Sequence, residues 1–223
     1  MLLDPQRVIT VIIPTCNDAL HLPGTINALR TAASQSGQRL NLRIVDAGSS
    51  DGTPQIAEAY EGIVHHAPLL RLGPQLNYGS AGVRTGILWF VRVGTAVPAD
   101  AYERISEVMA DPRILGGGFA RFYDSPSRLL RYTCRLTAWR TRRYGWIRGD
   151  QSLFVRAEVF HAMGGFSESA RGKTLDFARR LRRQGKTVLI NSPVVSSAQR
   201  YQRRGPVRQT LRDFRFTLKT LRQ

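Results

Sequence analysis

Short apolar runs alternate with amphipathic stretches along the first half of the chain. The apolar runs are four to seven residues long, which is typical of strands, and they lie at 8–14, 42–46, 63–66 and 87–93. We expect helices at 22–33 and 54–60, between these runs, and at 96–110, after the last of them. The stretch 73–86 is expected to be a loop that runs into a helix. Strands that alternate with helices predict an α/β fold with a mostly parallel central sheet flanked by helices.

The pattern changes near residue 115, where the glycine run of GGGFARF opens a basic second half. Helical stretches rich in arginine are expected at 127–145 and 175–185, and a strand-like run follows at 187–190. We expect this half to continue the same domain, so that residues 1–205 form one domain. Residues 206–223 are predicted to form a separate basic amphipathic helix.

Two of the basic stretches place apolar residues on one helical face and basic residues beside them. In 206–223 the apolar residues recur at alternating steps of four and three, and the basic residues follow one step around the helix. The stretch 128–142 has the same character, with Leu129, Tyr132, Leu136 and Trp139 beside Arg128, Arg131, Arg135 and Arg142. Such helices suit a membrane interface. The alternative is that the apolar face packs on the domain and the arginines are solvated.

The charge of the chain is strongly positive, at +17, with 33 basic and 16 acidic residues. Residues 1–70 hold four arginines, no lysine and six acidic residues, so the basic excess lies in the rest of the chain. This asymmetry favours an anionic membrane, a phosphorylated ligand or a nucleic acid. The alternative is that a high-GC genome inflates the arginine content. Because no nucleic-acid recognition motif is visible, we expect no specific nucleic-acid partner.

The location of the protein is predicted from three features. Cys16 and Cys134 are far apart in sequence and predict no disulfide framework, so a reducing compartment is expected. The start, MLLDPQRV, is not that of a signal peptide. The most apolar stretch, at 87–97, contains Arg92 and is too short to span a bilayer. We therefore expect a cytoplasmic protein, held peripherally at the inner face of the membrane.

The most informative short stretch is LRIVDAGSSDGTP, at 42–54. A strand ends at Asp46, and a loop rich in glycine and serine leads to Thr53 and Pro54, which predict a helix start with a hydroxyl N-cap. Ligands of open α/β sheets bind in the crevice at the carboxyl ends of strands, where Asp46 would lie. The alternative is that Asp46 and Asp51 only bond nearby backbone N–H groups, as turn aspartates often do.

Several motifs, taken in order, resemble those of family 2 glycosyltransferases. They are VIIPTCND, VDAGSSDGT, QLNYG, FVRVGTAVP, GGGFARF, RGDQSLFVR, GGF and ARRLRRQG, and the resemblance extends over about residues 8–200. The chain is most similar to small bacterial members of the selenodomain-associated transferase 2 type. The resemblance implies a GT-A fold and transfer of a sugar from a nucleotide-diphosphate sugar, with inversion, to an unknown acceptor that we expect at a membrane.

The resemblance also implies which residues bind the donor. The strand-end Asp46 would contact the nucleotide, and the loop after the first strand would cradle it. Gln75 and Asn77 match a donor-binding motif, although polar residues that open a helix often serve as caps. The full predicted nucleotide-sugar-binding set is Pro14, Thr15, Asn17, Asp18, Asp46, Gly48, Asp51, Gln75, Asn77 and Arg92.

The chain departs from the family at two motifs. Family members hold a divalent ion, Mg or Mn, on an aspartate after the fourth strand, where this chain has Gly94, so no metal ligand is predicted. The catalytic Glu-Asp pair is replaced by Lys173 and Thr174, which leaves Asp176 and Asp150 as candidate bases. Asp150 has a structural alternative, because turn aspartates commonly bond backbone.

Two readings of these departures stay open. In one, the protein is a metal-independent transferase in which Lys173 or Arg92 neutralises the departing diphosphate. In the other, it is a catalytically inactive domain that binds nucleotide or a partner.

Overall fold

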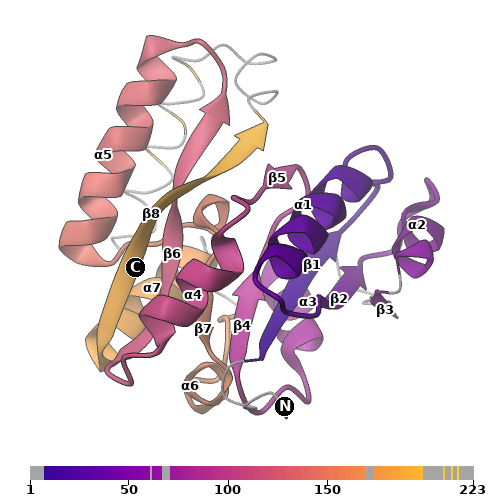
Figure 1. Cartoon of the computed structure of the whole chain (residues 1–223), viewed down its shortest axis with the longest axis horizontal. Helices are drawn as coiled ribbons and strands as arrows, with labels where there is room; N and C mark the ends of the chain where they lie inside the picture. Colours follow the sequence, from indigo (N-terminus) through magenta and orange to yellow (C-terminus); the bar gives the residue numbers. More distant parts are fainter. Residues whose placement is uncertain are drawn as a thin grey trace.

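The computed structural model describes residues 8–60, 62–66, 71–168 and 173–197, together with Arg208, Arg212 and Arg215. In this part of the chain the strands form one sheet in the order β3-β2-β1-β4-β7-β6-β8-β5 (Figure 1). The strands are β1 (Ile9–Thr15), β2 (Asn41–Asp46), β3 (Ile63–His66), β4 (Ile87–Phe90), β5 (Thr95–Ala96), β6 (Ile114–Asp124), β7 (Phe154–Arg156) and β8 (Lys186–Ser197).

The sheet is mixed because β7 runs against both of its neighbours. The pairs β1–β2, β1–β4, β2–β3 and β6–β8 are parallel. The pairs β4–β7, β6–β7 and β5–β8 are antiparallel. Since β4 and β6 are both antiparallel to β7, their carboxyl ends lie at the same edge of the sheet. The α/β fold expected from the sequence is confirmed.

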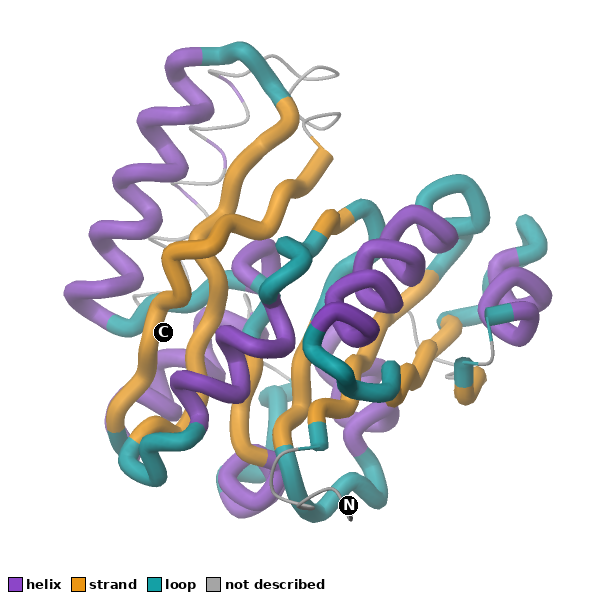
Figure 2. The backbone as a smooth tube through the Cα atoms, in the orientation of Figure 1, coloured by secondary structure: helices purple, strands orange, loops and turns teal. Residues whose placement is uncertain are grey.

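Helices cover both faces of the sheet (Figure 2). Alternate residues of β1 explain this, because Ile9, Val11 and Ile13 pack into one core and Ile12 into the other. One core includes α1 and α4, and the other includes α3, α6 and α7. The helices are α1 (Leu22–Gln35), α2 (Thr53–Ala59), α3 (Leu72–Ser80), α4 (Ala101–Met109), α5 (Arg128–Tyr144), α6 (Ala157–Ala162) and α7 (Lys173–Gln184), with a 3-10 turn η2 (Gly149–Gln151).

Two local expectations were wrong. The stretch expected as a loop running into a helix begins as helix, because α3 occupies 72–80 and the loop comes after it. Pro74 fits there, since the first helical turn needs no backbone donor. Thr53 is not the N-cap of α2. Gly52 is, with a left-handed φ of 82°, and the Thr53 hydroxyl donates to Asp51 Oδ1 over 2.5 Å.

The predicted C-terminal helix falls almost entirely outside the described residues. Of 206–223, Arg208, Arg212 and Arg215 are described, and each is helical and exposed. The domain boundary expected at residue 205 also lies outside the described part. Among the residues that the structure describes, no helix is long and apolar enough to cross a membrane.

Candidate functional site

Asp46 lies where the sequence predicted, at the carboxyl end of β2, and its carboxylate is bonded to its own loop. Oδ1 accepts from the Thr15 hydroxyl over 2.9 Å and from the Ser49 hydroxyl over 2.5 Å. Oδ2 accepts from the backbone N–H groups of Gly48 (3.0 Å) and Ser49 (2.8 Å). Burial alone would raise the pKa of Asp46, but the bonds from Ser49, Thr15 and Gly48 hold it below its ordinary value. Asp46 therefore fixes the loop, and its contact with a nucleotide stays a prediction.

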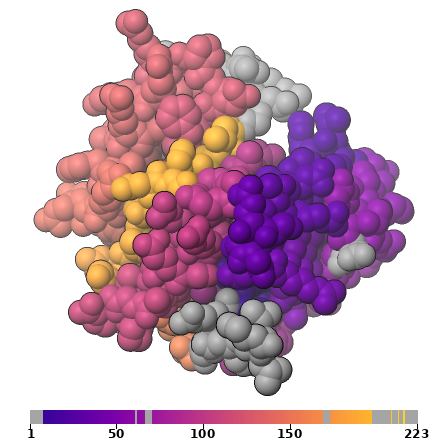
Figure 3. All heavy atoms as spheres, viewed as in Figure 1, coloured from indigo at the N-terminus to yellow at the C-terminus, as the bar shows by residue number. Residues whose placement is uncertain are grey.

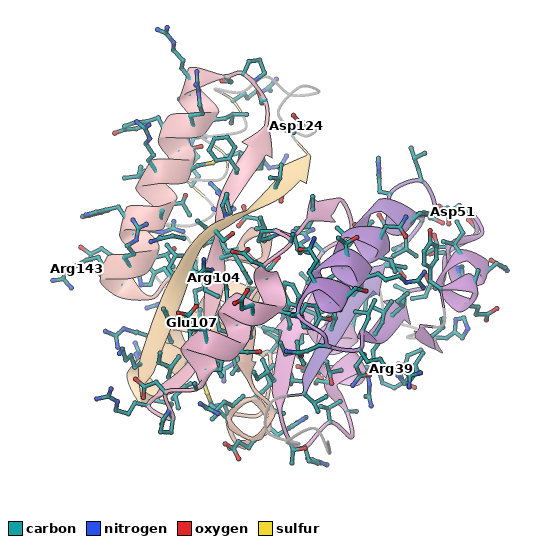
Figure 4. All side chains as sticks on the ribbon, viewed as in Figure 1. Arg39, Asp51, Arg104, Glu107, Asp124 and Arg143 are labelled. Atoms are coloured by element: carbon teal, nitrogen blue, oxygen red, sulfur yellow. The ribbon has the colours of Figure 1, made fainter. Side chains whose placement is uncertain are left out.

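The loops after β1 and β2 are joined side by side. Asn17, with a left-handed φ of 54°, donates its N–H to Ser49 Oγ and accepts from the Ser50 N–H, over 2.8 and 2.9 Å. Asp51 accepts from the Ala19 N–H over 3.0 Å. One further bond closes the contact, from the Asp18 N–H to Thr53 Oγ1 over 2.9 Å, while Asp18 Oδ2 accepts from the Cys16 N–H within its own loop over 2.9 Å. The two loops thus form one surface at the edge of the sheet, and Figure 4 shows Asp51 at the α2 end of the molecule.

The two polar residues of α3 connect elements of the fold. Gln75 is buried, and its Nε2 donates to the carbonyls of Thr15 (3.0 Å) and Val45 (2.6 Å), which joins the ends of β1 and β2. Asn77 exchanges two bonds of 2.8 Å with the backbone of Phe166. The described contacts of both side chains are structural. A role in donor binding stays a prediction for both.

A small, mostly apolar pocket opens at the carboxyl ends of β1 and β4. Its interior of about 10 Å³ has room for roughly one water molecule. Arg92 is the charged residue of the lining and Thr174 the hydroxyl-bearing one. The lining consists of Pro14, Leu72, Leu76, Phe90, Val91, Arg92, Gly149, Leu153 and Thr174.

The residues next to this pocket do not fit the metal usual in the family. Gly94, at the position of the missing aspartate, has a left-handed φ of 78°, and its N–H donates to Thr25 Oγ1 over 2.9 Å. Within the described ranges no three His, Cys, Asp or Glu residues gather into a group that could hold a metal ion. Hard divalent cations require several oxygen ligands, usually including carboxylates.

Asp150 forms a cluster with arginines beside the pocket. Its Oδ2 accepts from Arg121 and, over 3.2 Å, from the Tyr123 hydroxyl, while Arg148 Nε lies 3.6 Å from Oδ1. Burial alone would raise the pKa of Asp150, but Arg121, Arg148 and Arg92 hold it well below its ordinary value. A carboxylate so strongly held in its ionised form is a weak proton acceptor. The cluster places several positive charges next to the pocket.

The other two catalytic candidates point elsewhere. Asp176 Oδ2 pairs with Arg180 Nε over 3.1 Å on the same helix, and Arg180 also donates to the carbonyls of Met163 and Gly165. Lys173 Nζ donates to the carbonyl of Glu168. The side chain that reaches the pocket from the start of α7 is Thr174. Counting back from ARRLRR matches Thr174 to the family's aspartate, and this match was the signal in the sequence that could have identified it.

The family described as Glycosyl transferase family 2 matches residues 10–170. No curated protein matches the chain in sequence. A mannosyltransferase from Pyrobaculum calidifontis, in complex with GDP-Man and Mn²⁺, is a similar solved structure at TM-score 0.68 and 17% identity, covering 93% of this chain and 64% of that chain. TarS residues 1–349 from S. aureus align at TM-score 0.65 and 13% identity, covering 85% of this chain and 60% of that chain. Glucosyl-3-phosphoglycerate synthase from Mycobacterium tuberculosis, with phosphoglyceric acid, aligns at TM-score 0.58 and 18% identity, covering 84% and 70%.

These structural likenesses support the GT-A fold predicted from the motifs. The chain spans somewhat under two thirds of the length of the first two structures, at 64% and 60%. The selenodomain-associated subtype stays a prediction. Because the family match extends over residues 10–170 of a chain of 223, the chain belongs to glycosyl transferase family 2.

Proposed function

We propose that this protein transfers a sugar from a nucleotide-diphosphate sugar to an acceptor hydroxyl, with inversion at the anomeric carbon. The observation that carries the proposal is the family match, because it includes both loops that are joined at the carboxyl edge of the sheet. That edge is where open α/β sheets bind ligands. Solved structures of similar fold are complexes with UDP, UDP-GlcNAc or GDP-Man, which supports a nucleotide-sugar donor.

Arg92 is the residue we propose to neutralise the departing diphosphate. It follows β4, lines the pocket and lies close enough to Asp150 to lower the pKa of that carboxyl. A guanidinium is permanently charged and can bond phosphate oxygens in a bidentate manner. A fixed cation aimed at the leaving group stabilises the charge that develops there, so no carboxylate-bound metal is required for this step.

Deprotonation of the acceptor is the step for which the described site offers least. Neither Asp150 nor Asp176 is among the residues that line the pocket, and both are ion-paired. We propose that the Thr174 hydroxyl, at the position matched to the family's aspartate, orients the acceptor. The acceptor proton then passes to a solvent water as the bond from the sugar to the diphosphate breaks and the new glycosidic bond forms. The acceptor is proposed to be carried at a membrane surface.

A thermal-shift screen against nucleotides and nucleotide sugars tests the donor assignment. A ligand that binds the folded state at 100 times its Kd stabilises it by about 2.7 kcal/mol, so a true donor raises the melting temperature visibly. Donor turnover is then measured with and without EDTA, and we expect equal rates. Strong inhibition by EDTA would overturn metal independence. The absence of any shift with the whole panel would contradict the proposed function itself.

The second candidate is a catalytically inactive domain that binds nucleotide or a partner. Gly94 and Thr174, in place of the two family carboxylates, favour it. Normal nucleotide binding without turnover of any donor would identify this case. Binding of polynucleotides with a steep salt dependence, and no response to nucleotide sugars, would instead indicate a nucleic-acid-binding protein.

A further inference from the structure

Helix α5 turns three large side chains, Tyr132, Leu136 and Trp139, away from the protein. The residues that it buries against the domain are Leu130, Cys134, Thr137 and Thr141. Helical geometry places Tyr132, Leu136 and Trp139 on the opposite face. Their exposed fractions are 64%, 47% and 56%. The alternative considered from the sequence, in which this apolar face packs on the domain, is therefore wrong for α5.

The same outward face is basic along its whole length. Five arginines of α5 are exposed, and no acidic residue occurs between Arg128 and Tyr144. Figure 4 shows Arg143 projecting from the end of the helix, away from the rest of the molecule. The exposed arginines are Arg128, Arg131, Arg135, Arg142 and Arg143, of which Arg142 also donates to Asn191 Oδ1 of β8 over 2.5 Å and so lies at the border of this face.

The position of α5 makes this face accessible to a large flat partner. The helix packs on β6 and β8 by one side and forms an outer edge of the molecule (Figure 3). Its seventeen residues make a ridge about 25 Å long at 1.5 Å per residue. Aromatic and aliphatic side chains flanked by arginines are the composition of helices that lie in the interface of an anionic bilayer.

We propose that the outward face of α5, defined by Tyr132, Leu136 and Trp139 with the five exposed arginines, docks on an anionic lipid surface. The arginines match the negative headgroups, and Leu136 and Trp139 enter the headgroup region. A nucleic acid would use the arginines but would leave the exposed leucine in water. The inference deepens the proposed function and rests on it for its purpose, since the docked enzyme would meet a membrane-borne acceptor.

The test is flotation of the full chain with vesicles, without donor or acceptor. The vesicles contain phosphatidylglycerol and phosphatidylcholine, or phosphatidylcholine alone. Leu136→Ser is paired with Leu20→Ser, because Leu20 is also exposed, at 84%. Arg135→Glu is paired with the exposed Arg39→Glu, which changes the net charge equally, and Figure 4 shows Arg39 at the other end of the molecule. Circular dichroism verifies that each variant is folded.

We expect wild type to float with the anionic vesicles and not with the neutral ones. Arg135→Glu should weaken binding at least about fivefold, because one basic residue near an anionic surface strengthens binding by about that factor. Leu136→Ser should weaken it about tenfold, because less apolar surface leaves water. Both control variants should bind as wild type does, and Trp fluorescence should shift to the blue on binding.

Three outcomes would overturn the inference. They are no flotation of wild type with anionic vesicles, equal losses in the α5 and control variants, and loss in Arg212→Glu but not in Arg135→Glu, which would assign binding to 206–223. Binding of polyuridylate without vesicle binding would likewise reject a lipid partner. A failure of the nucleotide-sugar screen together with normal flotation would remove the proposed function and leave the docking surface standing.

Discussion

One substitution tests both the structural role of Asp46 and its predicted contact with the nucleotide. In Asp46→Asn a buried carboxylate that accepts four hydrogen bonds becomes an amide that accepts fewer. We expect a loss of about 1–3 kcal/mol in the free energy of unfolding, the cost of unpaired buried polar groups. We also expect nucleotide affinity to fall by about 1.5–3 kcal/mol, the range for a bond to a charged group. Urea unfolding and calorimetric titration measure the two effects.

For the effect on stability, Asp51→Asn is the matched control for Asp46→Asn. Asp51 lies in the same loop and also bonds backbone N–H groups, but it is exposed. It should alter stability much less. Unchanged nucleotide affinity in folded Asp46→Asn would leave Asp46 with a structural role alone.

Arg92 and Lys173 can be distinguished as the cation of the site. Arg92 lines the pocket, whereas Lys173 Nζ is bonded to a backbone carbonyl. Arg92→Gln should lower donor turnover about 10²–10³-fold, the typical loss when one transition-state donor is removed. Lys173→Gln should turn over donor at nearly the wild-type rate in the same assay. The reverse result would return the role to Lys173.

Asp150 gives the protein a predictable response to acid. Its pKa is lowered in the folded state, so its contribution to stability is present above the unfolded pKa of about 3.9 and is lost as the pH falls through the folded value. At pH 7 we expect Asp150→Asn to cost about 3–5 kcal/mol, because Arg121 keeps a buried charge. The difference between wild type and variant in the free energy of unfolding, measured with urea, should become smaller below about pH 4.

The surface pair of Asp111 and Arg113, in which Arg113 is 80% and Asp111 25% exposed, provides the control. Asp111→Asn should change stability much less, since surface ion pairs contribute little. If the loss of unfolding free energy in Asp150→Asn does not change with pH, the carboxylate is not stabilised in its ionised form.

At the residue scale the sequence predicted where side chains lie better than what they bond. Asp46 is at the strand end, as expected from LRIVD, but its four partners come from Thr15, Gly48 and Ser49. Gln75 shows the limit more clearly, because its amide joins two strands that are distant in sequence. Partners of this kind depend on the packed loops, which no local pattern contains.

Helix α3 illustrates how elements constrain glycine. A Cβ at Gly79 would lie 2.5 Å from Val45 Cγ2 and 2.7 Å from Ile12 Cγ2, so the helix approaches the sheet only because this side chain is absent. We expect Gly79→Ala to destabilise the fold by about 1–3 kcal/mol through overpacking. Gly24 of α1 has no atom within 4 Å of such a Cβ, so Gly24→Ala should stabilise by about 0.5–1 kcal/mol. Thermal unfolding of the two variants should therefore move in opposite directions.

The elements whose pattern is local were predictable, and those shaped by close approach were not. The strand at 63–66 and the helix that begins at Leu22 were predicted from the spacing of apolar residues. The glycine run at 116–118 was assigned to no strand from the sequence, yet it lies inside β6. A Cβ at Gly116 or Gly117 would lie 2.4 Å from the carbonyl of Phe154 or of Val188 respectively, and this crowding exists only once β7 and β8 are in place.

At the scale of the whole molecule, the charge of +17 should make stability depend on salt. Like charges repel most in the compact state, and screening lengths fall from about 30 Å at 0.01 M to about 8 Å at 0.15 M salt. Raising sodium chloride over that interval should therefore raise the melting temperature, by about 2–4 °C for each kcal/mol gained. Choline chloride should have the same effect if screening is the cause. A fall in melting temperature would mean that attractive ion pairs outweigh the repulsion.

The reversed direction of β7 divides the sheet into two blocks that share one hydrophobic core. β1 to β4 are parallel to one another, β6 and β8 are parallel to one another, and the blocks are joined through the short pairings of Phe154 and Val155. The joined loops after β1 and β2 belong to the first block, and α5 packs on the second. A chimera that exchanges the second block for that of a relative would therefore have to match β7, the pairing of β5 with β8, and the core that Phe119 and Val194 share with the first block. A relative that meets these three conditions could supply a new surface while the loops after β1 and β2 are kept.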